Sequence, residues 1–328
     1  MKVGLIDVDY NGSFPNIPLM KLSAWHKSQG DNVEWYMPFH DRYDKVYVSK
    51  VFSWSEDYTD VINADEIIKG GSGYSIGIRN GVEFWYRETE PGLYRWQRDN
   101  IWFMCGLPDH IEHIYPDYSI YPTITKDTAY GFLTRGCPRQ CSFCHVAAKE
   151  GTRSIKVADL QEFWCGQKNI VLCDPNILAC NSRIELLQQL IDSRAYVDFN
   201  QGLDARMLNE EVCEMLCRIK IKNIHFAWDR YEDKDVILSK LQLFANYKYT
   251  GRNTNHNAIV YTLVNYDTTI EQDLDRIYTL RDLGYWAYVM IYDKEHCEQT
   301  YKHLARWCNN RVIFATCKKF EDYNNKLG

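Results

Sequence analysis

Short apolar runs recur along the chain and alternate with polar segments that have the length of helices. In the first third, residues 17–28 show the pattern of a helix that ends at Gly30. Short strands that alternate with helices are typical of a parallel sheet. The pattern predicts an open, Rossmann-like α/β domain over residues 1–114. The expected strands cover residues 2–8, 33–36, 46–52 and 65–68.

A segment with two prolines, from Tyr115 to Pro122, interrupts this alternation. Proline fixes φ and discourages regular structure, so we expect a linker over residues 115–128. From residue 129 the alternation resumes with greater regularity, and its short apolar runs are those of strands buried on both faces. The expected strands cover residues 130–134, 169–173, 196–200, 223–228, 258–264 and 287–292.

Six strand–helix units of this kind predict a partial (β/α)6 barrel of the TIM type over residues 129–294. A C-terminal helix and tail are expected over residues 295–328. In such a fold the reactive groups lie at the carboxyl ends of the strands. The loops that follow the strands are therefore the place to look for chemistry.

Helix boundaries in this second region are predicted from capping signals. Ser182 with Glu185, and Thr268 with Glu271, form capping boxes that open two of the helices. Gly284 lies where the second of these helices should end.

Composition and charge narrow the functional classes. The 328 residues are 45% hydrophobic and 25% charged, which is ordinary for a folded soluble protein. The formal net charge of −6 argues against nucleic acid as a partner. The first residues form an apolar strand and no signal peptide, and no apolar run reaches the length of a membrane span. We expect a cytoplasmic protein with no membrane partner.

Three of the twelve cysteines form a compact group. The other nine are scattered and are interpreted as plain core or surface residues. Cys137, Cys141 and Cys144 lie within eight residues, directly after the first strand of the predicted barrel. Three thiolates in one loop can hold an iron–sulfur cluster, because soft sulfur ligands suit iron. With no fourth cysteine nearby, one iron of a four-iron cluster would stay open to a small molecule.

Two other interpretations of these cysteines stay open. A structural zinc site needs four ligands, and His145 is a candidate for the fourth, although its position next to Cys144 makes a closed tetrahedron awkward. Cys141 and Cys144 also form a CxxC redox pair, which leaves Cys137 without a role.

The segment CPRQCSFC of residues 137–144 resembles the cysteine motif of the radical S-adenosylmethionine superfamily, CxxxCxxC with an aromatic residue before the last cysteine. Residues 200–206 and 264–269 resemble segments after the third and fifth strands of members with an N-terminal cobalamin-binding-type domain. Residues 116–118 are similar to the linker of those members. The resemblance extends over nearly the whole chain.

This resemblance implies a [4Fe-4S] cluster whose open iron chelates S-adenosyl-L-methionine through the methionine amine and carboxylate. Reductive cleavage of the cofactor then yields a 5′-deoxyadenosyl radical, which abstracts hydrogen from an unidentified small-molecule or peptide substrate. An electron donor such as a flavodoxin or ferredoxin is implied as a partner. The protein supplies placement, potential and exclusion of water.

The resemblance also implies cofactor-binding side chains in the loops. Phe143 would lie near the adenine, and Asp174 or Asn176 would suit the cofactor's ammonium group. Arg206 would suit a carboxylate, because its guanidinium donates paired hydrogen bonds. The plain alternatives are packing against the first helix for Phe143, turn chemistry for Asp174, and a surface ion pair for Arg206 and Asp229. The candidates expected to approach the ribose, the carboxylate or the substrate are Asn200, Gln201, Asp204, Arg206 and Asp229.

The first domain raises the question of cobalamin. Its GGSG loop at residues 70–73 is similar to the family's glycine turn, where bare backbone approaches a nucleotide tail, and a plain turn explains it equally well. The family's Asp-x-His-x-x-Gly motif is missing, because residues 7–12 read DVDYNG. His26 lies a helix away and is interpreted as a surface residue. Cobalamin therefore rests on fold analogy alone and is not favoured; the domain would instead cover the barrel mouth or hold substrate.

Two other functions remain as alternatives to a radical enzyme. One is a non-catalytic iron–sulfur or zinc binding module, which would need no polar ring around the cluster. The other is a tRNA-modifying enzyme resembling the methylthiotransferases. The acidic balance and the lack of a second cysteine group argue against the latter.

Overall fold

The computed structural model of the chain describes residues 1–39, 42–79, 82–85, 97–98, 101–104, 106–250 and 257–324. The chain divides into two compact units. One consists of Met1–Gly131 with Ala158–Gln167, and the other of Phe132–Val157 with Lys168–Gly328. Cys105, one of the scattered cysteines, and the last four residues of the predicted tail lie outside the described residues.

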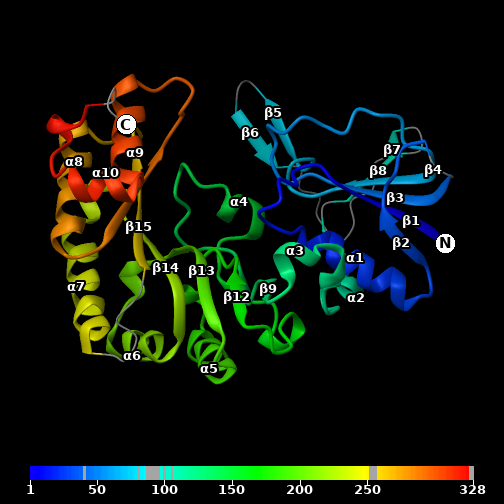
Figure 1. Cartoon of the computed structure of the whole chain (residues 1–328), viewed down its shortest axis with the longest axis horizontal. Coiled ribbons are helices and arrows are strands. Elements are labelled where there is room, and N and C mark those ends of the chain that lie inside the picture. Colours follow the sequence, from blue (N-terminus) through cyan, green and yellow to red (C-terminus); the bar gives the residue numbers. More distant parts are fainter. Residues whose placement is uncertain are drawn as a thin grey trace. The chain divides into compact units, whose positions relative to one another are not determined.

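The first unit is built on a parallel β-sheet (Figure 1). Its strands are β1 (Lys2–Asp7), β2 (Asn32–Trp35), β3 (Tyr43–Ser49), β4 (Ala64–Gly70) and β8 (Ile101–Met104). They lie in the order β2-β1-β3-β4-β8, and the short β7 (Gln97–Arg98) pairs antiparallel with β8. Separately, β5 (Ile76–Arg79) and β6 (Val82–Trp85) form an antiparallel hairpin. The predicted Rossmann-like sheet is confirmed.

The regular alternation of strands and helices expected in this unit is found only at its first connection, within the described residues. There α1 (Ile17–Ser28) joins β1 to β2. Residues 50–63, which are all described and join β3 to β4, contain no helix. Asp9 organises this segment instead, because its carboxylate accepts hydrogen bonds from the backbone N–H of Val51 and the hydroxyl of Ser55. A polar network thus organises the connection between β3 and β4.

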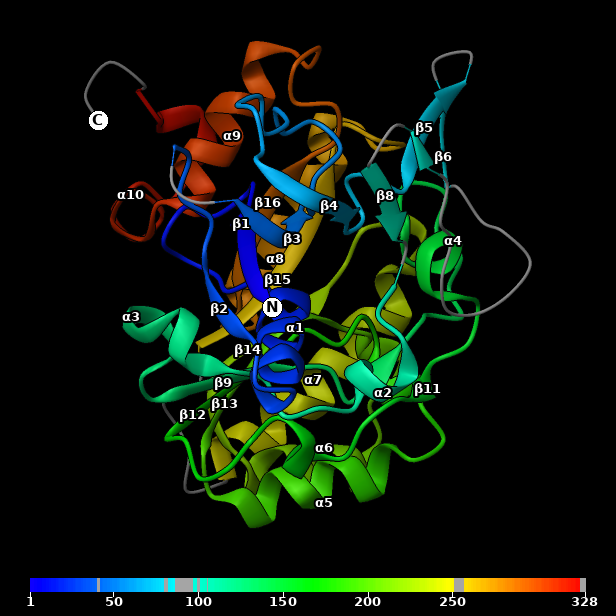
Figure 2. The ribbon, with the colours of Figure 1, turned by 90° about the vertical axis from the view of Figure 1, so that its right-hand side faces the viewer.

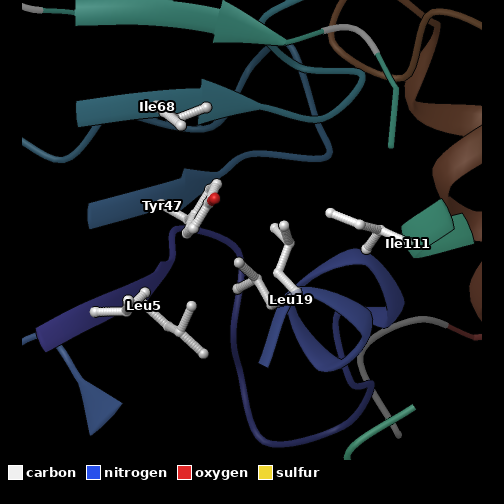
Figure 3. Packing of buried hydrophobic residues seen from close by; sticks show 7 residues of the cluster. Leu5, Leu19, Tyr47, Ile68 and Ile111 are labelled. Atoms are coloured by element: carbon white, nitrogen blue, oxygen red, sulfur yellow. The ribbon is translucent and has the colours of Figure 1, made fainter. Parts of the chain in front are cut away.

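Helix α1 forms as predicted and packs on the sheet. Asn16 caps it by accepting a hydrogen bond from the backbone N–H of Leu19 at 3.2 Å. Gly30, with a φ of 80°, follows its end and supplies the left-handed conformation common there. Burial of a large apolar side chain contributes roughly 1.5–3 kcal/mol. The cluster that α1 completes contains Val3, Leu5, Leu19, Leu22, Tyr47, Ile68 and Ile111 (Figure 3).

His26, expected on the surface, is fully buried in α1. Its Nδ1 lies 2.6 Å from a carboxylate oxygen of Asp31, and its Nε2 lies 3.0 Å from the hydroxyl of Tyr47. Asp31 also binds the N-terminal ammonium group at 2.7 Å. The expectation was wrong because a carboxylate five residues later and a strand tyrosine satisfy both ring nitrogens in the interior.

The segment predicted as a linker, residues 115–128, contains local structure and packs within the first unit. Residues Tyr118–Ile120 form a 3-10 turn and α3 covers Pro122–Thr125, following α2 (Asp109–Glu112). Buried Tyr121 donates a hydrogen bond to the carboxylate of Asp7 at 2.5 Å. Proline starts a helix here, because the first helical turn needs no N–H from it.

The second sheet contains six parallel strands among the described residues, in the order β16-β15-β14-β13-β12-β9 (Figure 1). The strands are β9 (Thr128–Gly131), β12 (Asn169–Leu172), β13 (Tyr196–Leu203), β14 (Lys220–Ala227), β15 (Asn257–Val264) and β16 (Trp286–Ile291). Spatial order follows chain order, and β9 and β16 lie at opposite edges. The predicted (β/α)6 arrangement is confirmed.

Helices join consecutive strands from β12 onward. They are α5 (Arg183–Ser193), α6 (Glu210–Arg218), α7 (Lys234–Thr250) and α8 (Ile270–Asp282). Helices α5 and α6 pack side by side (Figure 2). The end of the chain holds α9 (Gln299–Asn309), α10 (Arg311–Thr316) and a 3-10 turn at Phe320–Asp322, which is more regular than the expected helix and tail. Across the described ranges, no helix has both the length and the apolar character needed to cross a membrane.

Two predicted helix starts need correction. Ser182 does precede α5, but its side chain makes no capping hydrogen bond. The capping box of α8 is formed by Thr269 with Gln272, one residue later than expected. Thr268 instead donates to the carboxylate of Asp273 at 2.6 Å. The end of α8 is as predicted, because Gly284 has a φ of 79°.

The edge strand β16 is not buried on both faces, contrary to expectation, whereas in β14 the consecutive residues Ile224, His225 and Phe226 are all buried. In β16 the buried residues Ala287 and Val289 alternate with the exposed residues Tyr288 and Met290. Helix α7 covers one face of the sheet, where Phe226 of β14 packs against Phe244 with ring centroids 5.2 Å apart. An apolar run was misleading because tyrosine and methionine count as apolar and still line an open face.

Candidate functional site

The clustered cysteines lie in a loop that a short antiparallel ladder closes. Strands β10 (Thr134–Arg135) and β11 (Ile155–Lys156) pair at its base. Gly136 has a φ of 83°, and a Cβ atom there would lie 2.1 Å from a backbone carbonyl oxygen across the loop. Only glycine fits this position. The backbone is therefore fixed at the point from which Cys137 emerges.

The three cysteines are free thiols, with Cys137 and Cys141 partly buried and Cys144 exposed. Gln140, with a φ of 49°, turns the chain between the first two. The backbone N–H of Cys144 donates to the carbonyl oxygen of Cys141 at 3.0 Å. No three Cys, His, Asp or Glu side chains in the described part of the chain are arranged to hold a metal ion.

The electrostatic setting of the thiols suits a cation. Burial raises the pKa of both Cys141 and Cys144, and the charges of neighbouring cysteines and of Asp229 raise the pKa further. Arg206 acts in the opposite direction on the pKa of Cys141. A soft metal centre would remove this mutual repulsion by binding the sulfur atoms as thiolates. The donor set fits an iron–sulfur cluster.

Asn176, predicted as a cofactor ligand, contacts the first cysteine. It follows β12, is 2% exposed, and donates from Nδ2 to Sγ of Cys137 at 3.5 Å. Its Oδ1 is buried and has no hydrogen-bond partner among the described residues. Its backbone carbonyl accepts a hydrogen bond from Ser154 at 2.8 Å, which ties the far arm of the loop to the same residue. The vacant amide oxygen is an acceptor that an ammonium group would satisfy.

Asp174, which also follows β12, is buried, and its carboxylate is hydrogen-bonded to other residues of the protein. Its carboxylate accepts hydrogen bonds from the backbone N–H groups of Leu133 (3.1 Å) and Thr134 (2.5 Å) and from the Thr134 hydroxyl (2.7 Å). Burial raises its pKa to about 6, while these hydrogen bonds lower the pKa. The contacts make Asp174 a positioning residue for the segment between β9 and β10. They also explain why the predicted strand over 130–134 ends early.

Asp204, just after β13, pairs with two arginines, and one of them, Arg139, joins it to the cysteine loop. Its side chain is buried, and it forms ion pairs with Nε of Arg139 and with Nε of Arg206, the latter at 2.8 Å. Arg206 also pairs with Asp233 at 2.9 Å. Of the two interpretations given for Arg206, the ion pair within a loop describes it in this structure.

Phe143 contacts the loop that follows β15. Its ring centroid lies 5.3 Å from that of Tyr266 in an edge-to-face arrangement. The neighbouring Ser142 shares a hydrogen bond of 2.5 Å with the Tyr266 hydroxyl. Tyr266 in turn packs on Tyr292 at 4.8 Å. The contact observed for Phe143 is thus a tyrosine from the fifth strand's loop.

Asn200 and Gln201 occupy an irregular stretch of β13. The register with β14 shifts between Phe199 and Leu203, which is the signature of a bulge. The backbone carbonyl of Asn200 accepts a hydrogen bond from the Tyr261 hydroxyl at 3.2 Å, and Gln201 is exposed. Bulges near the ends of strands re-aim side chains. The two residues therefore lie on the rim of the sheet, and their contact with a cofactor stays a prediction.

Asp229 follows β14 and is influenced by several charges. Burial raises its pKa to about 6, and the charges of Arg276 and Arg206 lower the pKa. Since its charge also raises the pKa of Cys141 and Cys144, it lies within electrostatic reach of the cysteine loop.

Sequence reasoning missed three residues that contact this site. Arg139 lies between the first two cysteines, so its place in the motif was a usable signal. Tyr266 falls inside the segment 264–269 on which the resemblance already rests. Asp233 carried no signal, because its partner Arg206 comes close only through the fold.

The glycine loop of the first unit is explained by contacts within the protein. A Cβ atom on Gly71, which has a φ of 98°, would lie 2.3 Å from the carbonyl oxygen of Lys50. A Cβ atom on Gly73 would lie 2.7 Å from that of Phe52. The backbone N–H of Gly73 donates to Lys50 at 2.9 Å. A tight turn against the β3–β4 connection therefore accounts for these glycines without a ligand.

Comparison with known proteins adds no family to this picture. No family model and no curated protein matches the sequence. The case for a function therefore rests on the chain's own residues, foremost the cysteine loop and the side chains that contact it.

Proposed function

We propose that the protein is a radical S-adenosylmethionine enzyme that holds a [4Fe-4S] cluster through Cys137, Cys141 and Cys144. The observation that carries the proposal is the position of the CxxxCxxC loop, directly after β9 and before the other five strands of a parallel sheet. In open α/β sheets ligands bind at the carboxyl ends of the strands. Asn176 and Asp204 follow β12 and β13 at the same ends.

The chain's own residues divide the work of binding. The three thiolates would hold three irons, and the fourth would remain for the methionine part of the cofactor. When bound, the cluster and S-adenosyl-L-methionine supply a 5′-deoxyadenosyl radical by reductive cleavage. Oδ1 of Asn176 would accept from the cofactor's ammonium group, and Arg206 or Arg139 would pair with its carboxylate. Asp174 would keep the loop in place.

This proposal implies partners. A one-electron donor such as a flavodoxin or ferredoxin would reduce the cluster, and exposure of Cys144 gives the loop a solvent-facing side for it. The substrate would be a small molecule or peptide, and the compartment the reducing cytoplasm. Bound cobalamin is disfavoured for two reasons: the glycine turn packs against the protein's own backbone, and His26 is buried and paired with Asp31.

Anaerobic reconstitution with iron and sulfide tests the proposal. We expect about four irons per chain and the visible absorbance of a cluster. Cys141→Ala should lose most of both. The matched control is Cys165→Ala, which removes an exposed thiol in the other unit and should retain full iron.

Two results would reject a cluster at these residues. One is full iron content in the variant that lacks all three cysteines. The other is a wild-type chain that takes up zinc alone, which would favour the structural zinc interpretation.

A further inference from the structure

The sheet of the second unit carries polar side chains on the face opposite its helices. In β13 and β14 the buried residues Phe199 and Phe226 belong to the helix-covered face. Strand alternation places Asp198 and His225 on the other face. Parallel sheets are usually apolar on both faces, so this polar face calls for an explanation. We name it the acceptor face and define it by Asp198, His225, Tyr261 and Tyr288.

Asp198 is a carboxylate with an unused oxygen. Its Oδ2 accepts a hydrogen bond from Nδ2 of Asn223 at 2.6 Å. Its Oδ1 is buried and has no partner among the described residues. Within that same part of the chain, no lysine or arginine pairs with Asp198. Leaving a buried charged oxygen without a donor is unfavourable, and a bound donor would remove that penalty.

His225 provides a second acceptor on the same face. It is 8% exposed, and its Nδ1 lies 2.7 Å from the carbonyl oxygen of Phe199. Because a carbonyl can only accept, Nδ1 carries the proton, and Nε2 of the neutral ring is left as an acceptor. Within the described part of the chain Nε2 has no hydrogen-bond partner.

Tyr261 and Tyr288 add flat aromatic surface beside these acceptors. The rings of His225 and Tyr261 stack at 4.9 Å with an interplanar angle of 6°. Burial raises the pKa of Tyr261 to about 12, and the charge of Asp198 adds to that rise, so the two lie close together. The Tyr261 hydroxyl already donates to a backbone carbonyl. Tyr288 packs edge-on against Tyr261 at 5.9 Å and is 41% exposed, which leaves this side of the face open.

We infer that the acceptor face binds a small flat ligand rich in N–H donors, of the amidine, guanidine or amino-heterocycle class. The two vacant acceptors, Oδ1 of Asp198 and Nε2 of His225, need hydrogen-bond donors from a ligand. The unpaired negative charge of Asp198 favours a ligand that is a cation. The aromatic rings favour a planar partner, for which stacking and cation–π attraction add affinity. The same charge disfavours carboxylates and phosphates.

All four residues of the acceptor face belong to the second unit, so the inference needs nothing from the first. It also stands apart from the cysteines. Only the further step, that such a ligand is the substrate of the radical reaction, rests on the proposed function.

Binding of benzamidine to the metal-free chain tests the inference, with benzoate as the matched ligand that has the same ring and no donors. By titration calorimetry we expect benzamidine to bind and benzoate to bind at least about tenfold more weakly. Asp198→Asn and His225→Phe should each weaken benzamidine by about tenfold. Asp192→Asn, an exposed carboxylate on α5, should leave binding unchanged.

Circular dichroism melting of each variant separates loss of binding from loss of fold, and the two variants change the face independently. Equal binding of the two ligands, no binding of benzamidine up to about 10 mM, or unchanged affinity in folded Asp198→Asn would overturn the inference. Because the test uses metal-free protein, its failure leaves the cluster proposal untouched. A chain that binds benzamidine but no iron would reject the cluster and retain the acceptor face.

Discussion

Arg139 and Asp204 form an ion pair that joins the middle of the cysteine loop to the end of β13. The Asp204 side chain is buried, whereas Arg139 is 34% exposed. The second carboxylate oxygen of Asp204 is held by Arg206. The pair anchors the stretch between Cys137 and Cys141 to the sheet, where the proposal needs the first two thiolates to be placed.

Replacing Arg139 with Ala is expected to loosen the loop. The buried carboxylate of Asp204 would lose one of its two partners, at a cost of roughly 1–3 kcal/mol in the free energy of unfolding. Amide hydrogen exchange across residues 136–151 should become faster. Arg153→Ala, an exposed arginine of the same loop, serves as the control and should change neither quantity. Unchanged exchange in Arg139→Ala would show that the ion pair does not hold the loop.

Asp174 is expected to make stability depend on pH. Its pKa is raised from 3.8 to about 6 in the folded chain, chiefly by burial, so the folded state binds a proton that the unfolded state has lost between these values. The stabilisation that this bound proton gives the folded state is fully present below about pH 4 and is lost as the pH rises through 6. The free energy of unfolding should fall by on the order of 3 kcal/mol in total.

Urea unfolding of the wild type and Asp174→Asn between pH 4 and 7 measures this contribution. Asparagine cannot titrate. As the pH rises across this range, the free energy of unfolding of the wild type should therefore fall relative to that of Asp174→Asn. Asp229, whose pKa is also raised to about 6, remains in both proteins and cancels in the comparison. A constant difference between the two proteins would show that Asp174 titrates normally.

Asn176 is expected to tune the proposed cluster. Its amide donates to the sulfur of Cys137, and hydrogen bonds to ligand sulfur favour the more negative, reduced state. Asn176→Ala should therefore lower the reduction potential, by tens of millivolts if the bond contributes about 1 kcal/mol. A redox titration followed by electron paramagnetic resonance measures it, with iron content as the control. A potential equal to that of the wild type at full iron content would contradict this role.

Cobalamin is expected not to bind through a histidine. The loop after β1 has none, His26 is buried with both ring nitrogens engaged, and the glycine turn is packed against Lys50. Incubation with hydroxocobalamin, followed by gel filtration and absorbance spectroscopy, should give no stoichiometric complex with an axial protein nitrogen. Such a complex would contradict the prediction and point to methyl transfer.

Strand positions could be predicted from the sequence because the residues on the helix-covered face are buried and therefore apolar at alternate positions. Helix α1 was readable for the same reason, together with its glycine stop. The cysteine loop could be recognised without knowledge of the fold, since its three proposed ligands lie close together in the sequence. Features carried by short-range spacing were thus within reach of sequence reasoning.

Features that depend on residues distant in the sequence could not be predicted. The burial of His26 depends on Tyr47 from another strand, and the pairing of Arg139 with Asp204 spans the loop and β13. The β3–β4 connection looked like any other gap between strands, because the carboxylate that organises it, Asp9, lies about forty residues earlier in the sequence. The acceptor face was hidden for a related reason, since tyrosine and histidine fit a strand pattern whether or not a helix covers them.

Cleavage of S-adenosyl-L-methionine by the reconstituted, chemically reduced protein tests the proposed radical chemistry most directly. Liquid chromatography with mass detection would quantify 5′-deoxyadenosine. We expect its formation by the wild type and by Cys165→Ala, and none by the variant that lacks Cys137, Cys141 and Cys144. A wild-type chain with a complete four-iron cluster that forms no 5′-deoxyadenosine, or a triple variant that forms as much as the wild type, would contradict the proposed function.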